Sequence, residues 1–175
     1  MRAAVIAKWG GPEVLELREV ARPQPGPDEV LIRVRAFGLN HAESYFRQGL
    51  WGDVPRITGI ECAGEVATDP AEQLPPGQPV LAIVGGLGRD RNGTYAQFTV
   101  ARKSTVLAVN RNSLSWAELA ALPEVYATAW WSLVRNAKLA RAQVLVVRGG
   151  MSSLGQAAIN IAVSLGAKVI DVELP

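Results

Sequence analysis

Apolar and polar residues alternate over short runs through the first 110 residues of the chain. The runs predict β-strands at 3–8, 14–20, 29–39, 61–67, 79–84 and 94–100. The stretches between them, such as ARPQPGPDE and DPAEQLPPGQ, are rich in Pro and Gly, which interrupt regular strand pairing. Many short strands at this spacing are typical of a small barrel or sandwich.

The pattern changes to a helical period after residue 110. Ser115 followed by Glu118 has the spacing of a capping box, and it precedes a short apolar helix. Pro123 suits the first turn of a second helix, which is predicted to run through EVYATAWWSLVRNAKL. These two helices lead into an apolar strand at 143–147.

The last thirty or so residues predict a β-α-β unit. Apolar residues from Leu154 to Leu165 fall at offsets 0, 3, 4, 7, 8 and 11, which places them on one helical face that can cover a sheet. Gly166 is placed to end this helix, and AKVIDV returns as a strand. The two strands should therefore be parallel, with a right-handed crossover.

A glycine-rich turn, RGGMSSLG, joins the strand to the helix. Gly149, Ser152 and Gly155 have the spacing G-x-x-S-x-x-G. Glycines allow close backbone approach, and a helix N-terminus offers unpaired N–H groups, so such a turn can hold a nucleotide pyrophosphate. The spacing alone is explained equally well by a tight strand-to-helix turn without a ligand. Ser152 and Ser153 could cap the helix in either case.

Composition and charge exclude several classes of partner. The 175 residues are 49% hydrophobic and 19% charged, and the net charge of +2 comes from basic and acidic residues spread along the chain. No basic run is present that would follow phosphates, so we expect no nucleic-acid partner. The apolar run at the N-terminus is too short for a membrane span or a secretory signal, so we expect a cytoplasmic protein without membrane association. Cys62 is the single cysteine, which excludes an internal disulfide and a multi-thiolate zinc site.

Five segments in sequence order point to one protein family. They are MRAAVIAKWGGPEVLELREV, GPDEVLIRVRAFGLNHAESYFRQG, RITGIECAGEV, ELAALPEVYATAWWSL and VLVVRGGMSSLGQAAINIAVSLGAKVI. Together they resemble the zinc-independent quinone oxidoreductase branch of the medium-chain dehydrogenase/reductase family. The resemblance implies an α+β fold with a GroES-like β-barrel at 1–110, connecting helices at 111–141 and a partial Rossmann β-α-β unit at 142–175. We expect a truncated Rossmann domain, because family members are roughly twice as long.

The resemblance also implies an activity and a set of site residues. Members of this branch transfer hydride from NADPH or NADH to a quinone, an enone or another small, apolar conjugated carbonyl. Asn40 and Ile60 match the positions of a ligating cysteine and histidine in zinc-dependent relatives, so neither zinc nor another metal is expected. Asn40 and Thr128 match polar groups near the nicotinamide, and Tyr45 is expected to line the cleft. The phosphate turn corresponds to Gly149, Gly150, Ser152, Ser153, Leu154 and Gly155.

Acidic residues end the second predicted strand, where relatives that prefer NADPH carry hydroxylated and basic residues. Glu173 would hydrogen-bond a ribose diol and repel a 2′-phosphate, which favours NAD. Asp171 and Glu173 could equally be solvated at the end of the chain. The open edges of a two-stranded sheet also predict a homodimer that forms through the truncated Rossmann unit.

A second hypothesis is a family member without cofactor function, in which the barrel cleft serves a cofactor-free acid/base enzyme or a small-molecule binding module. His41, Glu43 and Glu61 are its candidate catalytic groups, because imidazole and carboxylates exchange protons readily. His41 and Glu43 are two residues apart, so they would not share a face of a helix. The alternative interpretation is that NHAE opens the helix HAESYFRQG, with His41 half exposed in its first turn.

Overall fold

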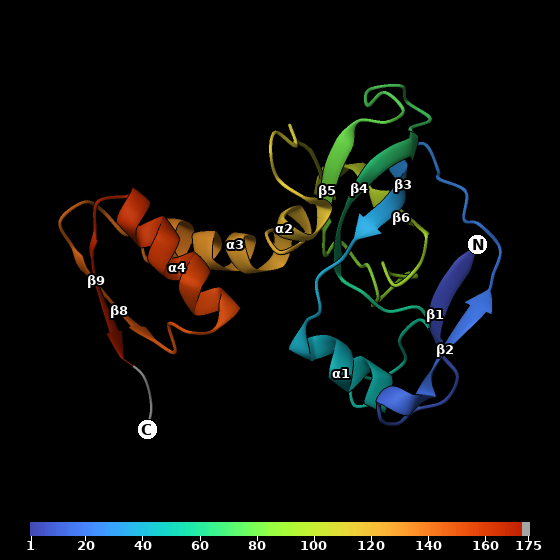
Figure 1. The fold of residues 1–175 in the computed structure, drawn as a ribbon, viewed down its shortest axis with the longest axis horizontal. Helices are drawn as coiled ribbons and strands as arrows, with labels where there is room; N and C mark the ends of the chain where they lie inside the picture. Colours follow the sequence, from blue (N-terminus) through green and yellow to red (C-terminus); the bar gives the residue numbers. More distant parts are fainter. Residues whose placement is uncertain (173–175) are drawn as a thin grey trace. The chain divides into compact units, whose positions relative to one another are not determined.

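The computed structural model describes residues 1–172 and shows two compact units (Figure 1). The first unit is Met1–Pro123, and the second contains the described residues from Glu124 onward. Glu173, one of the predicted cofactor-binding residues, lies outside the described residues. No helix within residues 1–172 has the length and apolar character needed to cross a membrane.

The first unit is built on a five-stranded antiparallel sheet with the order β6-β3-β4-β5-β7. Its strands are β3 (Glu29–Ala36), β4 (Glu61–Thr68), β5 (Pro79–Ile83), β6 (Phe98–Arg102) and β7 (Val106–Ala108). A hairpin outside this sheet pairs β1 (Arg2–Ile6) with β2 (Leu15–Glu19), and a short 3-10 turn, Pro12–Val14, joins the two strands. An isolated bridge between Ala3 and Ala96 connects the hairpin to the segment before β6.

Fully buried side chains from the strands form the main core of this unit. Val30 and Ile32 from β3 pack with Cys62 from β4 and with Val80 and Ala82 from β5. They stand two residues apart on β3 and on β5, so they lie on the same face of the sheet. Burial raises the pKa of the Cys62 thiol to about 12, and the neighbouring Glu61 adds to this effect. Cys62 is therefore a protonated, apolar packing residue.

Two short helices flank this sheet. The helix α1 (His41–Gln48) ends at Gly49, whose φ of 75° lies in the left-handed region that favours glycine. The helix α2 (Trp116–Ala120) begins with the predicted capping box. The Glu118 N–H donates to Ser115 Oγ at 3.2 Å, and the Ser115 N–H donates to Glu118 Oε2 at 2.7 Å.

The second unit contains the predicted β-α-β arrangement. Its helix α3 (Pro123–Trp130) continues into a π-helical turn, Trp131–Asn136, and then β8 (Val144–Arg148), α4 (Ser153–Ser164) and β9 (Lys168–Val172) follow. The strands β8 and β9 are parallel, with Val144 opposite Lys168 and Arg148 opposite Val172. The helix α4 packs against both strands (Figure 1). The predicted α+β fold class is confirmed.

Two sequence predictions differ from the structure in position. The strand predicted at 94–100 is found at Phe98–Arg102, because the residues before it bond to other segments. The Tyr95 N–H donates to Thr58 O, and Tyr95 O accepts the Ala4 N–H. The helix predicted to continue to Leu139 ends earlier, because its last turn widens and Lys138 adopts a φ of 52°.

Gly155 provides a test of how closely the glycine turn packs against α4. A Cβ atom on Gly155 would lie 2.7 Å from the Gly150 Cα, and it would also overlap the Gly149 carbonyl. We predict that Gly155→Ala lowers the free energy of unfolding by about 1–3 kcal/mol, although alanine normally favours a helix by about 1 kcal/mol. Urea unfolding followed by circular dichroism measures the change.

The matched control is Val163→Ala, also in α4, because the Val163 side chain is 61% exposed. This control should change the free energy of unfolding by no more than about 0.5 kcal/mol. Stabilisation by Gly155→Ala would show that the turn and α4 are not in close contact.

Candidate functional site

Asn40 sets the geometry at the start of α1. Its backbone is extended, with φ −114° and ψ 146°, and it precedes the first helical residue, His41. The Asn40 N–H donates to Glu43 Oε2 at 2.8 Å, which is one of the two bonds of a capping box. The short sequence NHAE therefore turns the Glu43 side chain back toward the loop that follows β3.

Glu43 joins three segments of the first unit. Besides the Asn40 N–H, its carboxylate accepts the Ile60 N–H at 3.0 Å and the Tyr95 hydroxyl at 2.6 Å. Ile60 lies directly before β4, and Tyr95 lies in the segment before β6. Glu43 is 4% exposed, so these bonds supply a buried carboxylate with the donors that it requires.

Burial governs the acidity of this cluster. It raises the pKa of Glu43, although the bonds from Asn40, Tyr95 and Ile60 oppose the rise. Burial also raises the pKa of Tyr95, and the adjacent Glu43 carboxylate raises it further. Tyr95 therefore remains a neutral donor to Glu43 at physiological pH.

A second buried carboxylate, Glu61, holds the Asn40 side chain. Asn40 Nδ2 donates to Glu61 Oε1 at 2.8 Å, and Glu61 is 4% exposed at the first position of β4. Gly38 packs so closely on this carboxylate that any Cβ at position 38 would overlap it. The structure thus brings together three of the predicted site residues, Asn40, Glu43 and Glu61.

His41 and Tyr45 form a separate, exposed pair on α1. His41 Nε2 lies 3.0 Å from the Tyr45 hydroxyl, and the two rings meet edge to face at an interplanar angle of 88°. The Tyr45 ring is also stacked near Trp51, with ring centroids 6.5 Å apart. His41 is exposed and Glu43 is buried, as expected for residues two positions apart on a helix.

The second unit contains the predicted phosphate turn. Gly149 has a φ of 82°, and the Ser152 hydroxyl donates to Gly149 O at 2.8 Å while accepting the Gly155 N–H at 3.0 Å. Ser152 therefore caps α4, whose first residue is Ser153. Leu154 is 43% exposed beside this turn.

Asp171, at the fourth position of β9, lies beside this turn. Asp171 Oδ1 accepts the Gly150 N–H at 3.0 Å, and its carboxylate lies where a Gly150 Cβ would be. The acidic character of the strand end was visible in the sequence, but its contact with Gly150 depends on the register of β8 and β9. The Gly150 N–H is therefore paired with Asp171 in this structure.

A cavity of about 240 Å³ adjoins the turn within the second unit. Residues of β8 and the first turns of α4 line it, together with the end of α3 and the π-helical turn that follows; among them are Arg148, Ser152, Leu154 and Gly155. Thr128 is not among the lining residues. It is exposed, and its hydroxyl donates to Glu124 Oε1 at 3.0 Å.

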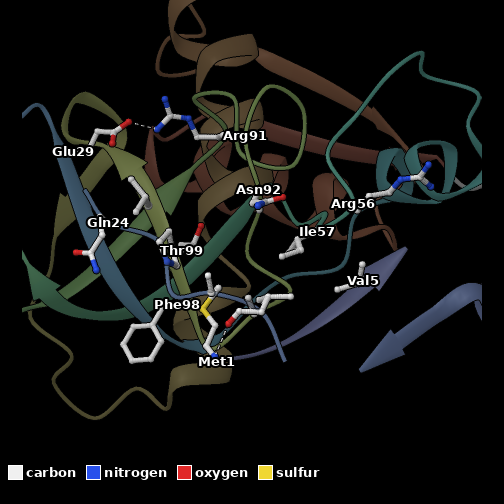
Figure 2. A pocket seen from close by; sticks show the side chains of 16 residues that line it. Met1, Val5, Gln24, Glu29, Arg56, Ile57, Arg91, Asn92, Phe98 and Thr99 are labelled. Atoms are coloured by element: carbon white, nitrogen blue, oxygen red, sulfur yellow. Dashed lines mark hydrogen bonds and ion pairs between the residues drawn. The ribbon is translucent and has the colours of Figure 1, made fainter. Parts of the chain in front are cut away.

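A larger cavity of about 600 Å³ lies in the first unit (Figure 2). None of the predicted site residues lines it. The sequence reasoning also missed Tyr95, which stands out only as an aromatic residue with a polar tip in an apolar stretch. A buried tyrosine hydroxyl usually finds a partner, but the sequence does not say which.

Asn40 and Ile60 are the two positions that the family resemblance aligns with zinc ligands. Asn40 bonds to Glu61, and Ile60 is a buried apolar residue. Across residues 1–172, no three His, Cys, Asp or Glu side chains gather in a way that could hold a metal ion.

Comparisons with known proteins give a consistent picture of ancestry. Residues 26–111 match the alcohol dehydrogenase GroES-like domain. Quinone oxidoreductase from Homo sapiens is 32% identical over 97% of this chain and 52% of its own length, and that from Mus musculus is 32% identical over 97% of this chain and 51% of its own length. The chain therefore spans about half the length of the curated relatives it matches.

Solved structures agree with these relatives. A structure described as an NAD-dependent alcohol dehydrogenase has a TM-score of 0.90 and 32% identity, covering 98% of this chain and 57% of that one. A quinone oxidoreductase from Coxiella burnetii has a TM-score of 0.85 and 27% identity, and the match covers 98% of this chain and 56% of that one. The chain belongs to the medium-chain dehydrogenase/reductase family. The curated relatives that it matches include quinone oxidoreductases.

Membership of the medium-chain dehydrogenase/reductase family confirms the predicted ancestry and the GroES-like barrel followed by part of a Rossmann sheet. A further neighbour in this family, a mycobacterial protein, was solved in complex with NADPH; it has a TM-score of 0.85 and 28% identity, and the match covers 98% of this chain and 52% of that one. Oxidoreductase relatives do not favour the hypothesis of a cofactor-free acid/base enzyme or binding module.

Glu43 provides the first test of this site. We predict that Glu43→Ala lowers the free energy of unfolding by about 2–4 kcal/mol, because it leaves the Asn40 N–H, the Ile60 N–H and the Tyr95 hydroxyl without their acceptor. The control Glu16→Ala removes an exposed carboxylate that is paired with Arg18. It should change the free energy of unfolding by no more than about 0.5 kcal/mol. Equal losses in urea unfolding would contradict the proposed role of Glu43.

The raised pKa of Glu43 gives a pH-dependent prediction. The folded chain binds the proton of the Glu43 carboxyl group more tightly than the unfolded chain does. The contribution of Glu43 to stability therefore falls as the pH rises from the ordinary glutamate pKa of about 4.3 through the raised pKa of the folded chain. Glu43→Gln has no such proton. The free energy of unfolding of the wild type minus that of Glu43→Gln should therefore decrease over this interval in urea titrations, and an increase would contradict the sign of the shift.

Proposed function

We propose that the chain provides the acceptor-binding barrel and part of the cofactor site of a zinc-independent, nicotinamide-dependent reductase. The substrate would be a quinone, an enone or another small conjugated carbonyl. In this proposal the barrel at 1–110 contributes acceptor contacts, 142–175 contributes dinucleotide contacts, and 111–141 connects them. The observation that carries the proposal is the hydrogen bond by which the buried Glu61 carboxylate holds the Asn40 amide. The family resemblance supports it, because it aligns Asn40 with a metal ligand of zinc-dependent relatives.

Asn40 has the chemistry to position a carbonyl compound without a metal. When bound, the nicotinamide cofactor supplies the hydride. The Glu61 carboxylate fixes the Asn40 amide, and the Glu43 bonds fix the loop from which that amide projects. A fixed amide stabilises the negative charge that develops on the acceptor oxygen better than a mobile amide does, because it needs no reorganisation during the reaction. Thr128 and Tyr45 would contribute contacts to the cofactor carboxamide and the acceptor ring.

The glycine turn suits the adenosine half of a dinucleotide in its backbone geometry. The left-handed Gly149 and the close approach of Gly155 to the Gly149 carbonyl produce the sharp strand-to-helix turn that nucleotide sites require. Gly150, Ser153 and Leu154 complete it beside the cavity lined by Arg148 and Ser152.

Asp171 favours NADH over NADPH in this proposal. Its carboxylate can accept hydrogen bonds from a ribose diol, whereas a 2′-phosphate would meet it as a like charge. A cytoplasmic location is part of this proposal.

Cofactor titration tests the proposal. We predict that NADH quenches tryptophan fluorescence at submillimolar concentration and that NADPH binds more weakly. Asp171→Ala should raise the affinity for NADPH relative to NADH at least about fivefold, because it removes the repulsion. The control Asp53→Ala removes an exposed carboxylate of the first unit and should leave the ratio unchanged. Absence of binding by either cofactor at millimolar concentration would contradict the reductase proposal.

Self-association through the second unit is a further part of the proposal. One face of the β8–β9 pair exposes Val144, Val146, Ile170 and Val172, each at least 44% accessible. Both β8 and β9 also have an unpaired edge within the described residues. A two-fold arrangement of two chains would cover both copies of this surface at once.

Light scattering after size-exclusion chromatography tests this association. We predict a dimer at micromolar concentration, and we predict that Val146→Asp shifts it to monomer. The control Leu17→Asp places the same charge on a side chain that is 78% exposed in the first unit, and it should leave the dimer intact. A wild-type chain that is monomeric at this concentration would contradict the proposal.

A further inference from the structure

The cavity of about 600 Å³ in the first unit lies in line with the strand β1. At the start of β1, one strand separates β2 from the segment before β6. The Met1 ammonium donates to Val20 O on one side, and Arg2 O accepts the Gln97 N–H on the other. Beyond Met1 both neighbours continue, as residues 20–24 and as β6, and both line the cavity. The cavity therefore occupies the place in which one more strand would continue β1.

The strand β6 borders this cavity with an unpaired edge. It is the outermost strand of the five-stranded sheet, in which β3 is its partner. The Val34 N–H donates to Gln97 O at the start of their pairing. In antiparallel pairing every second residue bonds to the partner strand, so Thr99 also faces β3. The backbone groups of Phe98 and Val100 therefore point away from β3, and both residues line the cavity.

The outer-edge groups of β6 call for another backbone. Neither Phe98 nor Val100 forms a backbone hydrogen bond to a segment other than β3 within residues 1–172. Along a strand edge, N–H donors and C=O acceptors recur every two residues, or about 7 Å. An extended polypeptide matches this repeat with its own N–H and C=O groups, as in recognition by strand addition.

The opposite wall keeps the gap narrow. Arg22 projects from residues 20–24, and its guanidinium carbon lies 4.0 Å from the centre of the Phe98 ring, so one side chain spans the two walls. A strand in this gap has a wall along each of its edges and must therefore enter with both edges free. Each edge strand of the described chain already has one edge paired, so a folded second copy does not supply such a strand. The occupant is instead a segment that is unpaired before it binds.

The side chains of the lining define the side chains of this segment. Apolar groups cover most of the wall, namely Val5, Val20, Ile57, Phe98 and Val100. Successive side chains of a strand point to opposite faces, so every second residue of the segment would meet this wall. These residues should be apolar.

The charged groups of the lining are already engaged. Glu29 pairs with Arg91, and the Met1 ammonium pairs with the exposed Glu19 carboxylate. Figure 2 shows the Arg56 side chain extending away from the cavity. The residues of the segment that face the wall should therefore carry no charge.

We propose that this cavity takes up an extended segment of a partner polypeptide as an additional strand on β6. The backbone of the segment bonds to the outer-edge groups of Phe98 and Val100, and its alternate apolar side chains pack on Val5 and Ile57. None of the residues of the site around Asn40 lines the cavity. The proposal is therefore independent of the proposed reductase activity.

Two peptides with the same side chains test the backbone pairing. The probe is acetyl-Ser-Val-Lys-Val-Ser-Val-Lys-amide, in which valines alternate with polar residues, and the control carries a methyl group on each backbone nitrogen. In two-dimensional NMR titrations of the full chain, we expect the control to bind at least about tenfold more weakly than the probe, because it has lost its backbone donors. Equal affinities, which indicate an apolar pocket without strand pairing, or no binding of the probe at about 1 mM would each overturn the proposal.

Hydrogen exchange of the wild-type chain locates the bonds. The amide protons of Phe98 and Val100 should exchange faster than that of Thr99 in the free chain, because Thr99 faces β3. Saturation with the probe should slow the exchange of Val100 by a larger factor than that of Thr99. An unchanged Val100 would overturn the proposal. Protection of Val100 in the free chain that is lost on dilution would show that a second copy fills the site, and would also overturn it.

Matched variants of Val100 test the donor on β6. Val100→Pro removes the N–H at the outer edge and leaves the bonds to β3 in place, so it should weaken binding of the probe about five- to tenfold. Val100→Thr keeps the N–H and the branched shape of the side chain, and it should bind the probe within about twofold of the wild type. Equal effects of the two substitutions would overturn the proposal. The comparison of the two peptides on the wild type decides the question even where a variant does not fold.

Discussion

The buried carboxylate of Glu43 is the interaction on which the first unit depends. It accepts hydrogen bonds from the start of α1, from the residue before β4 and from Tyr95 before β6. The Ile60 and Tyr95 segments also make backbone hydrogen bonds to other parts of the unit, and Glu43 adds a side-chain acceptor that they share. Burying a carboxylate alone would be costly, but the three hydrogen-bond donors compensate much of that cost, and the carboxylate links the segments that carry them.

The position of Asn40 follows from this junction. Its N–H is bound to Glu43 and its amide to Glu61, so two buried carboxylates hold the backbone and the side chain of one residue. The family resemblance aligns Asn40 with a metal ligand of zinc-binding relatives, and in this chain the position carries an amide that is bonded to Glu61. The second unit shows a comparable constraint, because Asp171 binds the turn that would face a nucleotide. In both places a carboxylate accepts a backbone N–H and holds the segment that carries it.

The sequence predicted the elements well where local pattern determines them. The capping box at Ser115, the helix after Asn40 and the β-α-β unit all follow from spacing within a few residues. Features that depend on distant segments could not be predicted. The bond from Tyr95 to Glu43 spans 52 residues, and the strand predicted at 94 begins four residues later because Tyr95 pairs with Thr58 and Ala4.

The candidate site was only partly accessible to sequence reasoning for the same reason. The identities of Asn40, Glu43 and Glu61 came from the sequence and the family resemblance, but their shared hydrogen bonds come from the antiparallel sheet that brings β3 and β4 together. The cavity beside β6 had no sequence signal, because its walls come from five separate stretches of the chain.

A double-mutant cycle between Glu43 and Tyr95 tests the central claim most directly. The free energies of unfolding of the wild type, Glu43→Ala, Tyr95→Phe and the double variant give the coupling between the two side chains, because alanine leaves no acceptor for the Tyr95 hydroxyl. If the hydroxyl and the carboxylate share a buried bond, the coupling should be at least about 1 kcal/mol. Additive effects, with a coupling near zero, would contradict the claim that Glu43 holds these segments together.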